Sequence, residues 1–174
     1  MGVVREEPDL VRELGTVNRR LRDLEAAPRQ GGVISYVEVT TSQTGIPVDT
    51  NVAIAGLDLS FALGARRTVR VYAEVTFSKG PADATGMGLL GVRLGDSLTG
   101  QELIRRHVLV QQGNDQAINV TRVFQVPAGS YRLGAWAYSW ISWLNITAGP
   151  AQPSLLLVED LGETQAGPGI WGGD

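Results

Sequence analysis

The chain has 174 residues, a net charge of −3 at pH 7 and no cysteine. This length fits one domain with a sizeable core and an appendage. The mild acidity and the scattered basic residues argue against a nucleic-acid-binding groove, so no nucleic-acid partner is expected. The lack of thiols excludes disulfides and thiolate metal sites, so stability must come from packing or assembly.

The N-terminal region combines a helical pattern with a charged start. Apolar residues recur between positions 8 and 27 in alternating steps of four and three, which is the coiled-coil period. They are Leu10, Leu14, Val17, Leu21 and Leu24. The pattern predicts a parallel coiled-coil stalk over residues 1–30, and an amphipathic helix packed on its own domain is the alternative. Fewer than three heptads with Gly15 inside cannot hold chains together alone, so a second contact is expected downstream.

The first fifteen residues, MGVVREEPDLVRELG, are charged throughout and contain no apolar run, which predicts no signal peptide. No stretch approaches eighteen consecutive apolar residues, so no membrane partner is expected. We therefore expect the chain to be made and kept in a cytoplasm.

From Val33 onward the helical period gives way to short β-rich runs separated by Gly, Pro, Asp and Asn. The runs cover residues 33–41, 51–62, 67–77, 86–95, 102–111, 117–126, 131–141 and 153–160. They predict a mainly β fold: an antiparallel eight-strand jelly-roll sandwich over residues 31–162, preceded by the short coiled-coil helix. A Gly-rich extended tail is expected over residues 163–174.

The seventh run, YRLGAWAYSWISW (131–143), holds three of the four tryptophans of the chain. Strand alternation places Trp136, Tyr138 and Trp140 on one face, opposite Leu133, small residues and Ile141. Three rings of about 150–250 Å² each form a patch that must be covered. Contact with another copy of the chain is the preferred interpretation.

Two other interpretations of the aromatic run stay open. The rings could form an ordinary aromatic core, or they could form a carbohydrate platform. In the second case Trp143 and Asn145 are the candidate ligand-binding residues, because sugar recognition combines flat apolar rings with nearby polar groups.

Motifs for catalysis are missing from the sequence. His107 is the only histidine, so it cannot pair with cysteine or with a second histidine. The stretch GMGLLG (86–91) matches a dinucleotide-binding fingerprint letter for letter, but no helix is expected after it. We therefore expect no enzyme activity, no cofactor and no metal site.

Three short stretches, AGLDLSF (55–61), VPAGSY (126–131) and LLVEDLG (156–162), carry a family resemblance. Together with the heptad helix and the β-domain, the chain resembles small minor structural proteins of tailed phages that infect actinobacteria. The resemblance implies a virion protein, such as a minor tail, fibre or head decoration protein, whose jelly-roll head is similar to trimers of the tumour-necrosis-factor type. It also implies synthesis in the cytoplasm of the host bacterium, and the expected partners are the chain itself in a homotrimer and other capsid or tail proteins. Host cell-wall glycan is a partner under the alternative that the aromatic strand makes the chain a carbohydrate-binding module. No catalytic residue is implied.

Overall fold

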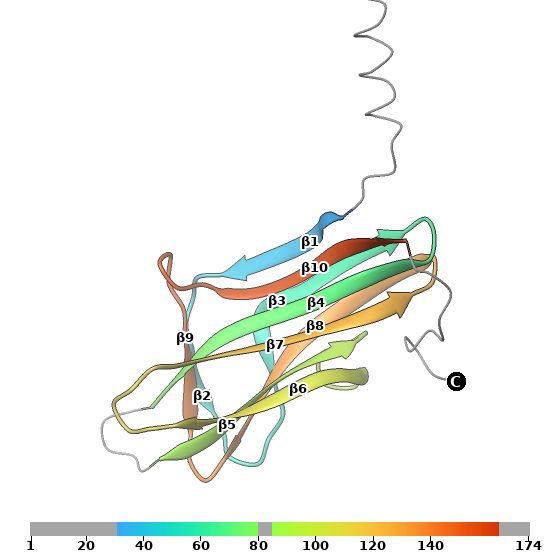
Figure 1. Ribbon diagram of the computed structural model, residues 1–174. Helices are drawn as coiled ribbons and strands as arrows, with labels where there is room; N and C mark the ends of the chain where they lie inside the picture. Colours follow the sequence, from blue (N-terminus) through green and yellow to red (C-terminus); the bar gives the residue numbers. More distant parts are fainter. Residues whose placement is uncertain (1–30, 80–84, 164–174) are drawn as a thin grey trace, which may run out of the picture. The chain divides into compact units, whose positions relative to one another are not determined.

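A computed structural model describes residues 31–79 and 85–163, in which ten strands form two antiparallel sheets (Figure 1). The strands are β1 (Gly32–Val39), β2 (Gln43–Ile46), β3 (Val52–Leu63), β4 (Arg67–Ser78), β5 (Gly86–Leu94), β6 (Gln101–Val110), β7 (Gln116–Val126), β8 (Gly129–Trp140), β9 (Leu144–Thr147) and β10 (Ser154–Glu163). The predicted stalk over residues 1–30 lies outside the described residues, as does the tail from residue 164. Both stay predictions.

The first sheet, sheet A, has β4 at its centre. One edge of β4 pairs with β10 along its first part and with β9 along its last part, and the other edge pairs with β7. Strand β1 pairs with the far edge of β10, and β2 pairs with the far edge of β9. The second sheet, sheet B, has the order β3-β8-β5-β6. The eight long strands are therefore arranged as in a jelly roll, which confirms the mainly β sandwich. The prediction of eight strands is wrong in number, because it lacks the four-residue strands β2 and β9.

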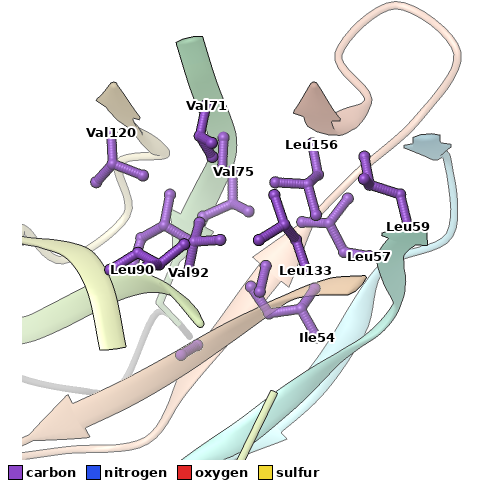
Figure 2. Close-up of a cluster of buried hydrophobic side chains, with 14 of the residues drawn as sticks. Ile54, Leu57, Leu59, Val71, Val75, Leu90, Val92, Val120, Leu133 and Leu156 are labelled. Carbon is purple, nitrogen blue, oxygen red and sulfur yellow. The ribbon is translucent and has the colours of Figure 1, made fainter. Parts of the chain in front are cut away.

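The core lies between the sheets and follows from strand alternation. In β4 the residues Val69, Val71, Ala73, Val75 and Phe77 are all fully buried, while the side chains between them point away from the core. Figure 2 shows side chains of both sheets meeting in this core. Within the described ranges, no helix is long and apolar enough to cross a membrane.

The strand register defines two ends of the sandwich. Gly32 pairs with Asp160, and Arg67 pairs with Glu163, so the described head begins and finishes at the same end. The short strands β2 and β9 lie at the opposite end (Figure 1). We call this the distal end.

The strand β8 ends in a tight turn at the distal end. Ile141 has a φ of 77°, and the Ser142 N–H donates to the Trp140 carbonyl at 2.9 Å, which closes a three-residue γ-turn. The prediction that Ile141 continues the strand on the same face as Leu133 is wrong. Its side chain is 67% exposed.

Candidate functional site

The outer face of sheet B carries the aromatic side chains of β8. Leu133, Ala135 and Ala137 belong to the core, so the alternating residues Trp136 and Tyr138 point away from it, followed by Trp140. The predicted division of this strand into two faces is therefore observed. Whether the face contacts a second copy stays a prediction.

Trp136 is covered by its own chain. Its side chain is 3% exposed although it stands outside the core cluster. It lies across Gly91 on the paired strand β5, and the guanidinium carbon of Arg93 sits 4.4 Å from the ring centroid. Such a cation over an indole contributes about 0.5–1 kcal/mol or more. The ring face of Trp136 is therefore occupied, and of the three predicted rings only Tyr138 and Trp140 remain partly open.

Trp140 and Tyr138 form a small aromatic cluster with His107. The ring centroids of Trp140 and Tyr138 are 4.4 Å apart, and those of Trp140 and His107 are 4.9 Å apart. The Tyr138 hydroxyl donates to Asp49 at 2.8 Å, and this bond raises the pKa of Tyr138. These contacts tie the loop before β3 to the sheet, and they occupy the polar groups near the rings.

The outer face of sheet A carries a second row of large side chains that the sequence did not single out. Strand register aligns Tyr36, Leu157, Tyr72 and Thr121 across β1, β10, β4 and β7. Tyr36 is 62% exposed, and Leu157 and Tyr72 are half-buried. We call these four residues the sheet A row. Two features of the sequence could have indicated this row: the run of apolar residues in β10, and Tyr72 on the solvent-facing side of β4.

A groove of about 400 Å³ runs beside the sheet A row. It is lined by Arg70, Tyr72, Thr121, Leu155 and Leu157. On this face Arg70 binds Glu159, and the Tyr72 hydroxyl donates a hydrogen bond to the Glu74 carboxylate. A charge that is already paired costs less free energy than an unpaired one when a partner removes its water.

Burial raises the pKa of Tyr72 to about 12, and the bond to the Glu74 carboxylate acts in the same direction. The folded chain thus keeps this proton when the unfolded chain, with a tyrosine pKa of 10.0, has lost it. The stability that this group contributes is fully present below pH 10 and is lost between pH 10 and about 12.

We therefore expect the free energy of unfolding to fall more steeply with pH above 10 in the unsubstituted chain than in Tyr72→Phe. Denaturant unfolding at intervals between pH 9 and 12 measures both slopes. Equal slopes would contradict the raised pKa of Tyr72.

The predicted ligand-binding residues lie at the distal end, in or directly before β9 of sheet A, whereas the β8 rings lie on sheet B. Trp143 is 60% exposed and lies against Gly45 of β2. The Asn145 side-chain oxygen accepts a hydrogen bond from the Gly45 N–H at 2.9 Å. Leu144 and Ile146 point into the core, so Asn145 projects from the outer face of sheet A. Trp143 and Asn145 thus both contact Gly45 of sheet A, whereas Trp136 lies on the outer face of sheet B.

Other candidate chemistry is sparse in the part of the chain that the structure describes. No group of three or more His, Cys, Asp or Glu side chains there could hold a metal ion. The glycines of GMGLLG have packing roles: a Cβ on Gly88 would lie 2.9 Å from Leu144, and one on Gly91 would lie 2.4 Å from Trp136. The stretch is strand β5 and precedes no helix, so the dinucleotide fingerprint has no structural basis here.

No protein-family profile matches the chain. No curated protein matches it either. The solved structure described as Eiger TNF from S. frugiperda is similar to it with a TM-score of 0.42 and 11% sequence identity, over 79% of this chain and 92% of that chain.

Proposed function

We propose that the chain is a non-enzymatic structural protein of a phage virion, a homotrimeric appendage of the minor tail, fibre or capsid-decoration kind. Its partners are then further copies of itself and other virion proteins. Its role is assembly of the particle or contact with the host surface. The proposal rests on the family resemblance for the virion and on the sheet A row for self-association.

The three stretches behind the resemblance form the fold and not a reactive site. In AGLDLSF, Gly56 has a φ of 75° at a β-bulge, and Leu57 and Leu59 enter the core. In VPAGSY, the Tyr131 hydroxyl donates to the Pro127 carbonyl at 3.0 Å across the turn between β7 and β8. LLVEDLG lies within strand β10. Such residues suit a protein whose task is to hold a shape.

The sheet A row is the observation that carries self-association. It crosses four strands, Leu155 and Val123 flank it, and its neighbour Arg70 is paired with Glu159 within the chain. A specific interface buries roughly 800 Å² per partner with an apolar centre and a polar rim. The sheet A row fits such a centre, and it fits a second copy better than a charged partner because its own four residues are neutral.

The aromatic strand fits this role less well than the sequence suggested. Trp136 already lies beneath Arg93, so of the three β8 rings only Trp140 and Tyr138 could meet an arriving surface, beside His107 and the exposed Leu109. We therefore assign self-association to sheet A.

Electron microscopy of purified phage particles that encode this chain tests its place in the virion. Particles labelled with an antibody against the β-head should show the label on an external appendage. Purified particles that lack the protein would contradict the proposed function.

A further inference from the structure

Trp143 forms a supported, open platform at the distal end. Gly45 carries no side chain, and a Cβ built there would lie 3.4 Å from Trp143 Cζ3 and 3.6 Å from Cε3. The indole therefore rests on the backbone of β2 with one side, while the side chain as a whole remains 60% exposed. Because the ring is already supported, a ligand that stacks on the open side orders little new structure.

The turn before Trp143 is held in place from both sides. The Ser142 N–H donates to the Trp140 carbonyl, and the Ser139 hydroxyl donates to the Ser142 carbonyl. Ile141 accepts a φ of 77° in this turn, a conformation that a β-branched residue rarely adopts. The platform thus stands on a fixed backbone.

Uncharged polar groups, an amide and two hydroxyls, lie beside the Trp143 platform. Asn145 uses its side-chain oxygen to accept from the Gly45 N–H, which sets the orientation of its amide. Among the described residues, its Nδ2 has no acceptor and remains a donor. Next to it, the Thr147 hydroxyl donates to Ser78 Oγ at 2.7 Å, which leaves the Ser78 proton for another acceptor. All of these groups project from the outer side of sheet A.

The exposed indole and the neutral polar groups beside it indicate which class of ligand could bind here. Trp143, Asn145, Ser78 and Thr147 are all neutral, and Lys79, next to Ser78, is only 7% exposed, so the described groups of the patch present no charge to a ligand. A flat apolar ring beside an amide and hydroxyls suits a molecule with an apolar C–H face and a rim of hydroxyl groups. We propose that Trp143 and Asn145 form a binding site for a neutral saccharide.

The site lies at the distal end, opposite the residues where the head joins the rest of the chain. Strand register also separates it from the sheet A row, since Asn145 pairs with Ser78 and Leu157 pairs with Tyr72. Saccharide binding therefore goes beyond self-association and does not depend on it.

Fluorine NMR of the full chain labelled with fluorotryptophan tests the site. The chain has four tryptophans, so each resonance can be assigned by substitution. We titrate with neutral tetrasaccharides of glucose, galactose and N-acetylglucosamine. At least one should shift the Trp143 resonance in a saturable way with a dissociation constant in the millimolar range, and the covered Trp136 should not respond. If none of the three gives a saturable shift of Trp143, the proposal is overturned.

Two substitutions separate a built site from chance contact with an exposed ring. Asn145→Asp keeps the oxygen that accepts from Gly45 but removes the Nδ2 donor, and it should weaken binding about tenfold or more. Leu109→Ala, at an apolar residue 54% exposed on the other sheet, should leave the affinity unchanged. Equal affinity in Asn145→Asp and the unsubstituted chain would overturn the role of the amide.

The same samples distinguish this proposal from the proposed function. Light scattering on the Trp143→Ala variant should give the same mass as the unsubstituted chain, with saccharide binding lost. A monomeric chain that still binds saccharide at Trp143 would overturn self-association and leave the site standing. If Trp143→Ala is still a trimer and the saccharide still shifts the resonances of other tryptophans, the proposed site is overturned and self-association stands.

Discussion

Replacing Gly91 with alanine is expected to lower the free energy of unfolding by about 3 kcal/mol. A Cβ at this position would lie 2.4 Å from Trp136 Nε1 and 2.5 Å from Cε2. Trp136 is 3% exposed and lies beneath Arg93, so its ring has little free space into which it could move aside. The indole must leave its place, and it then loses both its burial and the contact with Arg93.

Denaturant unfolding at equal protein concentration measures this effect, because assembly makes stability depend on concentration. Gly64→Ala is the matched control, since a Cβ there meets nothing within 4 Å. Adding Trp136→Ala should cost little in the Gly91→Ala background and much in the unsubstituted chain. If Gly91→Ala is as stable as Gly64→Ala, the indole does not lie on β5.

Replacing Leu157 with aspartate is expected to convert the homotrimer into folded monomers. Leu157 stands in the centre of the sheet A row, so a trimer would bury a carboxylate from each copy, and the nearby cation Arg70 is already bound to Glu159. An unpaired buried charge costs about 3–5 kcal/mol, repeated in every copy. In the monomer the same side chain is only half-buried and faces water, so the fold should survive.

Two variants on sheet B accompany Leu157→Asp. Leu109→Asp introduces the same charge on an exposed position of the other sheet and should leave the mass of the assembly unchanged. Trp140→Ala tests the interpretation that the β8 rings make the contact. A monomeric Trp140→Ala beside a trimeric Leu157→Asp would move the interface from sheet A to sheet B.

Strand alternation made much of the fold predictable. Residues from Val69 to Phe77 alternate without interruption, and the run predicted over 67–77 differs from β4 by one residue. The strands β2 and β9 could not be recognised, because four residues are too few for a period and the stretches around Gly45 and Asn145 look like loops. The γ-turn at Ile141 was also hidden, since a β-branched residue gives no turn signal.

The sites were harder to predict than the strands because they depend on register. The sequence placed Trp136 on an outward face, but its cover comes from Gly91 and Arg93 on β5. Similarly, Tyr36 and Leu157 are far apart in the chain and meet only through the pairing of β1 with β10. Local patterns give the face of each residue but not its neighbours across strands.

The mass of the unsubstituted full chain in solution tests self-association most directly. One chain has a mass of 18.6 kDa, so multi-angle light scattering at micromolar concentration should give about 56 kDa for the homotrimer. Leu157→Asp should give the mass of one chain in the same experiment. A mass near 18.6 kDa for the unsubstituted chain would contradict the account.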